Sequence, residues 1–207
     1  MGTNRGLTLH QHPIKIGEDF IQSWHIPEGI CDAILEYYQK NSDKQVKGHA
    51  LTSDGEHAHM KDIKDSIDVP IHANYFEQPF QDYRIELQKC LDEYVKIYRH
   101  IENLIKFNII EPYNIQHYPK GGGFKIEHFE RDGSFTKTIK RCLVFMTYLN
   151  DLDDGGTKFI YQNRIIKAQK GKTVIFPVDW THTHVSQISN TKEKTIVTGW
   201  YSYLWDS

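Results

Sequence analysis

Four residues in the second half of the chain have side chains suited to binding a metal ion and an organic acid. His128 and Glu130 form a His-x-acid triplet, a further histidine stands at position 184, and Lys194 follows ten residues later. Two imidazoles and one carboxylate occupy one face of an iron(II) ion and leave its other positions open. A cation just beyond the second histidine suits the far carboxylate of an acid co-substrate. The four residues therefore predict a non-haem iron site beside an acid-binding site.

Helical patterns come first along the chain, and strand patterns follow. Apolar residues recur at helical spacing over 30–38 and 81–104, whereas the polar segment 41–75 predicts a surface loop with one short strand. Segments rich in Val, Ile, Thr and aromatic residues predict strands over 107–118, 141–149, 158–166, 173–177 and 195–204. This order predicts an α+β chain with a double-stranded β-helix core, of the jelly-roll or cupin-like type, buttressed by N-terminal helices.

Such a barrel brings residues from non-adjacent strands together at its mouth, so His128 and His184 can bind one ion although they are far apart in the sequence. Strand alternation puts Lys194 on the same face as Ile196 and Thr198, with Lys192 in the preceding turn. The run Gly121-Gly122-Gly123 predicts a tight turn beside the site, because it lacks the context of a phosphate-binding loop.

The region of about 107–205 resembles the 2-oxoglutarate/Fe(II)-dependent dioxygenases, specifically their prolyl 4-hydroxylase-like branch. Several short elements carry the resemblance, and they occur in the family's order. They are Tyr118 ahead of a glycine-rich turn, His128-Phe129-Glu130, Tyr148-Leu149-Asn150, Gly155-Gly156-Thr157-Lys158-Phe159, Phe176-Pro177, His184, Lys194 and Trp200. An ordered set of this size is far more specific than a His-x-acid triplet alone.

The resemblance implies a hydroxylase of aliphatic C–H bonds that uses Fe(II), 2-oxoglutarate and O2, with ascorbate as a supporting reductant. It implies that His128, Glu130 and His184 bind the iron. It also implies that Lys194 pairs with the distal carboxylate of 2-oxoglutarate, with hydrogen bonds from two phenols, those of Tyr118 and Tyr148. The expected substrate is a peptidyl residue, proline first. A free amino acid or other small molecule is the alternative, and a non-enzymatic cupin-like binding module is the rival from another class.

The identity of the carboxylate ligand is open at the level of sequence. The family's usual first pair is His-x-Asp, whereas the longer Glu130 must fold back to reach the same metal. If this segment is a strand, positions 128, 130 and 132 share one face, so Asp132 competes with Glu130. Glu127 is a weaker candidate because it would point the opposite way.

Other histidines and lysines also compete for the assigned roles. His182 shares a strand face with His184 if both lie on one strand. The family spacing selects His184 and leaves His182 to line the site or to hydrogen-bond a metal-bound group. Family spacing and strand phase select Lys194 over Lys192. The pair His57 and His59 could bind a metal on an extended strand, but two exposed histidines in a polar loop are the favoured interpretation.

Length, charge and cysteine use narrow the class of protein. The 207 residues fit one domain, with a helical part over about 1–106 and a β core over about 107–205. The net charge of −2, without a basic run, disfavours nucleic acid as a partner. No signal peptide or apolar stretch long enough to span a membrane is visible. The cysteines at 31, 90 and 142 show no pairing pattern, which favours a reduced, cytoplasmic protein.

Overall fold

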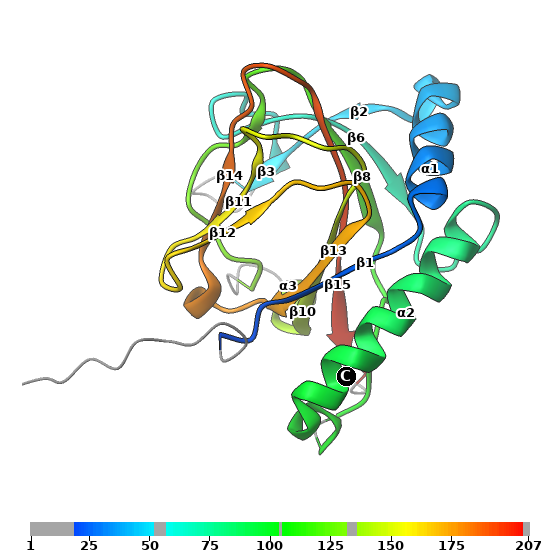
Figure 1. Ribbon diagram of the computed structural model, residues 1–207, viewed down its shortest axis with the longest axis vertical. Coiled ribbons are helices and arrows are strands. Elements are labelled where there is room, and N and C mark those ends of the chain that lie inside the picture. Colours follow the sequence, from blue (N-terminus) through cyan, green and yellow to red (C-terminus); the bar gives the residue numbers. More distant parts are fainter. Residues whose placement is uncertain (1–18, 52–56, 104, 132–135, 205–207) are drawn as a thin grey trace, which may run out of the picture.

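The computed structural model describes residues 19–51, 57–103, 105–131 and 136–204. Its largest element is an antiparallel sheet, whose strands bring the two halves of the chain together (Figure 1). In spatial order the strands are β1 (Gln22–His25), β13 (Lys172–Pro177), β10 (Arg141–Tyr148), β15 (Lys194–Tyr203), β8 (Tyr113–Tyr118), β6 (Ile67–Ile71) and β2 (Val46–Lys47), with β7 (Phe107–Asn108) also beside β15.

A smaller sheet lies beside the large one and completes the double-stranded β-helix. Its strands, in spatial order, are β12 (Arg164–Lys167), β11 (Gly156–Phe159) and β14 (His184–Gln187). Two short pairs of strands, β3 (Ala50–Leu51) with β4 (His57–Ala58) and β5 (Lys64–Asp65) with β9 (Gly123–Phe124), are separate from both sheets. Buried apolar residues from both sheets, among them Phe159, Phe176 and Ile196, form one core cluster between them.

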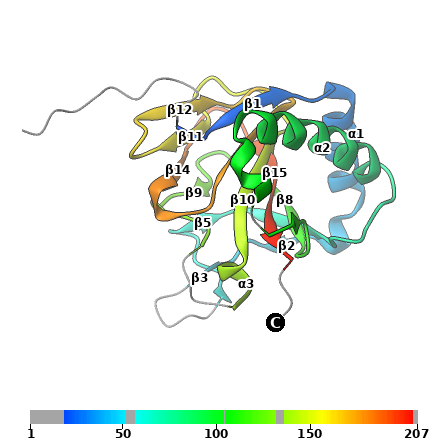
Figure 2. The same cartoon turned by 90° about the horizontal axis from the view of Figure 1, so that it is seen from below.

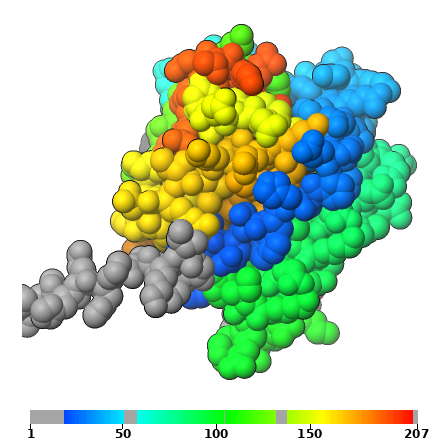
Figure 3. Space-filling view, in the orientation of Figure 1, coloured from blue at the N-terminus to red at the C-terminus, as the bar shows by residue number. Residues whose placement is uncertain are grey.

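Two helices cover the outer face of the large sheet. They are α1 (Glu28–Lys40) and α2 (Phe80–Ile97), and both contribute to a second apolar cluster. Adjacent residues of β15 show the division, because Ile196 faces the core between the sheets and Val197 faces the helices. Figures 2 and 3 show α2 along one flank of the molecule, so the helices buttress the sheet from outside as the residue pattern predicts.

The remaining helical segments are short: α3 (Thr136–Ile139) and the 3-10 turns η1 (Ser42–Lys44), η2 (Arg99–Asn103) and η3 (Trp180–His182). No helix among the described residues is long and apolar enough to cross a membrane.

The largest departure from the sequence prediction is the segment 41–75. It was expected to hold one short strand, but it contains β2, β3, β4, β5 and β6. Four of these strands are two residues long, too short to show an alternating pattern. Within the segment β2 pairs with β6 and β3 with β4, whereas β5 pairs with the distant β9. The strand β14 was not predicted either. Its four residues, HVSQ, contain a single β-branched apolar residue.

Candidate metal centre and co-substrate pocket

A cavity of about 600 Å³ is lined by the residues that the sequence singles out. Its walls come from both sheets and from the segment that follows β9. The six candidate site residues all line it: Tyr118, His128, Glu130, Tyr148, His184 and Lys194. Ile196, Thr198 and Trp200 line it too, so alternate residues of β15 face the cavity from Lys194 onward, in the phase that the sequence predicts.

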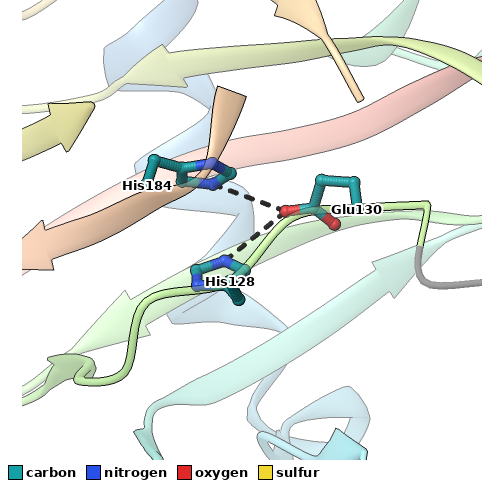
Figure 4. A group of neighbouring side chains, drawn as sticks. All are labelled: His128, Glu130 and His184. Carbon is teal, nitrogen blue, oxygen red and sulfur yellow. Dashed lines mark ion pairs between the residues drawn. The ribbon is translucent and has the colours of Figure 1, made fainter. Parts of the chain in front are cut away.

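His128, Glu130 and His184 converge at one end of this cavity (Figure 4). Glu130 Oε1 lies 3.5 Å from His128 Nε2 and 3.6 Å from His184 Nε2. One ligand atom from each residue lies within 4.8 Å of the others. The two histidines are also joined through their backbones, because each N–H donates to the other's carbonyl, at 3.0 and 2.9 Å. This reciprocal bridge brings a residue of the 124–131 segment against the first residue of β14.

Backbone carbonyls fix the imidazole rings in a metal-binding tautomer. His128 Nδ1 lies 3.0 Å from the carbonyl oxygen of Ile126, and His184 Nδ1 lies 3.0 Å from that of His182. A carbonyl oxygen only accepts, so each Nδ1 carries the hydrogen and each Nε2 keeps its lone pair. Burial, and secondarily the neighbouring His128, lowers the pKa of His184, which keeps its ring neutral. Two neutral imidazoles and one carboxylate fit a divalent iron ion.

The carboxylate of Glu130 is held from the side opposite the histidines. Its Oε2 accepts a 2.9 Å hydrogen bond from Trp200 Nε1. Arg141 stacks 3.5 Å over the Trp200 ring, donates to the Glu130 backbone carbonyl at 3.0 Å, and forms a two-pronged ion pair with Glu111. Burial raises the pKa of the Glu130 carboxyl, but the adjacent imidazoles of His128 and His184 outweigh it and hold that pKa well below its usual range.

Sequence reasoning matched Trp200 to a family element without giving it a role, and it missed Arg141 altogether. The signal available for Trp200 was its place on the cavity face of β15, three alternations beyond Lys194. Arg141 gives no such signal, because its contacts depend on the return of β15 beside β10.

Lys194 is buried, with 3% of its surface exposed, whereas Lys192 is exposed in the turn before β15. The Lys194 ammonium donates to the carbonyl of Gln187 at 3.0 Å and also to the Ser186 hydroxyl. Burial lowers the pKa of Lys194 to about 8. A buried ammonium held mainly by neutral oxygens gains from an anion placed beside it. The side chain is therefore suited to bind the carboxylate of a ligand in the cavity.

The two candidate tyrosines lie near this lysine and are buried. Lys194 Nζ lies 5.3 Å from the centre of the Tyr118 ring. The Tyr118 hydroxyl donates to Gln116 Oε1 at 2.6 Å, and the Tyr148 hydroxyl lies 2.7 Å from Thr157 Oγ1. Buried phenols need hydrogen-bond partners, and here the chain itself supplies them. Both residues line the cavity, and the O–H bond of a phenol can rotate towards another acceptor.

Among the competing residues, His182 does not line the cavity. Its Nε2 lies 2.9 Å from the carbonyl oxygen of Asp19, on the other side of the wall. The expectation of a shared face fails because His182 ends η3 and His184 begins β14, so the two are not on one strand. His182 contributes through its backbone carbonyl instead, which holds the ring of His184.

The segment around Glu130 is not a regular strand, so the alternation argument does not apply there. Glu127 is exposed at the cavity wall and lies outside the cluster of three. Asp132 and the side chain of His57 lie outside the described residues. His59 Nδ1 lies 3.1 Å from the backbone carbonyl of Gly48.

The comparisons with known proteins agree with this geometry. The sequence profile of the 2OG-Fe(II) oxygenase superfamily matches residues 113–202. Among solved structures, the chain is similar to the 2OG complex of the viral collagen prolyl hydroxylase vCPH from Paramecium Bursaria Chlorella virus-1. That match has 17% identity and a TM-score of 0.66, and covers 89% of this chain and 97% of the other. No curated protein sequence matches the chain.

Two further solved structures resemble the chain. A prolyl-4-hydroxylase from Pseudomonas putida has 14% identity and a TM-score of 0.64, over 90% of this chain and 94% of the other. A Trichoplax adhaerens prolyl hydroxylase, in complex with a hypoxia inducible factor oxygen degradation domain peptide fragment, has 16% identity and a TM-score of 0.66, over 91% and 86%. Similarities at these identities establish the fold, and the profile match relates the second half of the chain to the oxygenase superfamily. Residues 113–202, which include the six candidate site residues, match the 2OG-Fe(II) oxygenase superfamily, and the chain has a prolyl-hydroxylase-like fold.

Proposed function

We propose that the protein is a hydroxylase in which His128, Glu130 and His184 bind Fe(II) and Lys194 binds the distal carboxylate of 2-oxoglutarate. The observation that carries the proposal is the cavity itself, which the three metal donors and the buried lysine all line. The bound iron and 2-oxoglutarate would supply the oxidative decarboxylation that converts O2 into an oxidant for an aliphatic C–H bond.

The chain's own side chains would orient and shield these groups. The backbone carbonyls behind the imidazoles keep each Nε2 aimed into the cavity, and Trp200 keeps the Glu130 carboxylate turned towards them. Lys194 would give up part of its contact with neutral oxygens for a charge pair. In the same proposal the hydroxyls of Tyr118 and Tyr148 rotate to donate to the incoming carboxylate.

We propose a peptidyl residue as the substrate, with proline as the leading candidate and a free amino acid or other small molecule as the alternative. The similar Trichoplax adhaerens enzyme was solved with a peptide fragment, which supports this order. The segments 41–75 and 129–139 contribute wall residues to the cavity, and in this proposal they contact the substrate. From them come Val46, Lys47, His49, Ala50, Ile63, Lys64, Asp68, Pro70, Phe129, Glu130 and Thr138.

Succinate formation is the direct test of this function. With Fe(II), ascorbate, O2 and 2-oxoglutarate, the protein should release succinate slowly, and a proline-containing peptide should accelerate release and gain the mass of one oxygen atom. A His184→Ala variant should release none, because the metal loses one of its three protein ligands. Bound iron without any succinate would favour the non-enzymatic binding module instead.

The lysine assignment has its own test, with a matched control nearby. Lys194→Ala should weaken 2-oxoglutarate binding roughly ten- to hundredfold, since a hydrogen bond to a charged group contributes about 1.5–3 kcal/mol. Iron binding should stay near wild type, because the proposed charge pair is to the co-substrate. The exposed Lys192→Ala is the control, and an equal loss there would mean that the wrong lysine was chosen.

Two broader features complete the proposal. We propose that residues 1–207 act as one oxygenase domain, since β1, β2 and β6 of the first half join the large sheet of the second. We also propose a reducing, cytoplasmic setting. The cysteines at 31, 90 and 142 are all free and buried, which suits an environment where thiols persist.

A further inference from the structure

The side chain of Asn150 forms hydrogen bonds to the backbone of the neighbouring strand on both sides of Lys194. Its Nδ2 donates to the carbonyl of Glu193 at 2.8 Å, and its Oδ1 accepts from the N–H of Thr195 at 2.9 Å. One amide thus engages the backbone groups immediately before and after Lys194. No role was assigned to Asn150 from the sequence, where it completes the Tyr148-Leu149-Asn150 element.

The strand register explains why this support is needed. β10 pairs with β15 as far as Tyr148 opposite Ile196, and one more backbone bond runs from the N–H of Leu149 to the carbonyl of Thr195. Beyond it, no strand among the described residues pairs with β15 on that side. The Asn150 amide has a donor and an acceptor, so it continues the ladder for one more step. On the other side, Lys194 lies opposite Tyr118 of β8.

The turn before β15 is held from the same neighbourhood. Asp154 accepts hydrogen bonds from the Ser189 hydroxyl at 2.7 Å, from the Asn190 N–H at 3.1 Å and from the Thr191 hydroxyl at 3.1 Å. Asn150 therefore joins this anchored turn to the regular part of β15, and Lys194 lies at the junction.

We propose that Asn150 is a positioning residue, which fixes the backbone of Lys194 so that its ammonium meets the distal carboxylate of 2-oxoglutarate. The proposal rests on the assignment of Lys194 made above. A lysine side chain has a flexible four-carbon stem, so the place of its ammonium depends on how firmly its Cα is held. Loss of the Asn150 bonds would let residues 193–195 move, and the co-substrate would have to restore their order on binding.

The test measures 2-oxoglutarate binding by calorimetry on Fe(II)-loaded protein without oxygen. Asn150→Ala should weaken this binding roughly five- to tenfold, since it removes two hydrogen bonds of ordinary strength. Iron affinity should be unchanged. Asn150→Asp keeps an acceptor for the Thr195 N–H but loses the donor to the Glu193 carbonyl. It should therefore weaken 2-oxoglutarate binding less than Asn150→Ala does. The control is Asn190→Ala, an exposed asparagine in the same turn, which should bind as wild type does.

A double-mutant cycle separates positioning from general destabilisation. If Asn150 acts through Lys194, adding Asn150→Ala to Lys194→Ala should weaken binding little further. Fully additive losses, or unchanged binding in both Asn150 variants, would overturn the proposal. If Lys194→Ala alone binds 2-oxoglutarate as wild type does, the proposed function itself is wrong. Should Asn150→Ala fail to fold, the cycle is run with Asn150→Asp, whose unchanged or additive binding is equally decisive.

Discussion

Replacing Trp200 with phenylalanine should weaken iron binding without touching any of the three proposed ligands. The change removes one donor, the Nε1–H that bonds Glu130 Oε2 at 2.9 Å. It keeps an aromatic ring beneath Arg141, whose guanidinium carbon lies 3.5 Å from the centre of the Trp200 ring. Stacking is therefore largely retained, and the variant isolates the hydrogen bond.

The size of the effect follows from the charge on the acceptor. A hydrogen bond to a charged group contributes about 1.5–3 kcal/mol, and about 1.4 kcal/mol corresponds to a factor of ten in affinity. The full loss would be roughly ten- to a hundredfold. Arg141 Nη1 lies 3.8 Å from the same oxygen and can move closer to it. We therefore expect the lower end, about tenfold, which is also typical when a residue behind a metal ligand is removed.

The measurement is an anaerobic titration of metal-free protein with Fe(II), compared for wild type, Trp200→Phe and Trp180→Phe. Trp180 is the matched control because it is 63% exposed and contacts Tyr161 on the surface. Its replacement should leave iron affinity unchanged. If Trp200→Phe binds iron as tightly as wild type does, the Trp200 bond does not orient the Glu130 carboxylate for the metal.

Two further predictions concern pH and packing. Burial lowers the pKa of Lys194 to about 8, so as the pH rises through that value the free protein loses the ammonium and 2-oxoglutarate must bind together with a proton. Its affinity, measured by calorimetry from pH 7 to 9.5, should fall towards tenfold per unit on the alkaline side, and Lys194→Arg should remove the decline. Gly199→Ala should lower the unfolding free energy by about 1–3 kcal/mol, because a Cβ there would lie 2.5 Å from Phe145 and from Tyr113. Gly29→Ala, where a Cβ meets nothing within 4 Å, is the control in thermal unfolding.

The sequence was sufficient for the parts of the site that depend on local pattern. Family spacing and strand phase together select Lys194 over Lys192, and the structure places the first in the cavity wall and the second in solvent. The two helices of the first half also lie where apolar periodicity predicts them. In both cases one face of the helix or strand is buried, so apolar and polar residues alternate with a regular spacing. That spacing is visible in the sequence without knowledge of the element packed against it.

What the sequence could not reveal is determined by contacts between distant segments. The two-residue strand β5 depends on its pairing with β9, and His182 turns away because a 3-10 turn interrupts the strand expected there. The bonds of Asn150 to the backbone around Lys194 are of the same kind. They require β10 to end at Tyr148, opposite Ile196, while β15 begins two residues earlier at Lys194. Side-chain-to-backbone bonds of this type leave no periodic trace in a sequence.

The glutamate at position 130 shows how such contacts can alter a family motif. The residue does not lie on a regular strand, and its N–H is tied to the carbonyl of Val178 at 3.0 Å. From that backbone position the longer side chain lets one carboxylate oxygen face both histidines while the other reaches Trp200. An aspartate on the same backbone would be one methylene shorter and could not keep both sets of contacts without a backbone shift. The length of Glu130, its backbone bond and the indole of Trp200 are thus interdependent, and the departure from His-x-Asp preserves the three-donor geometry.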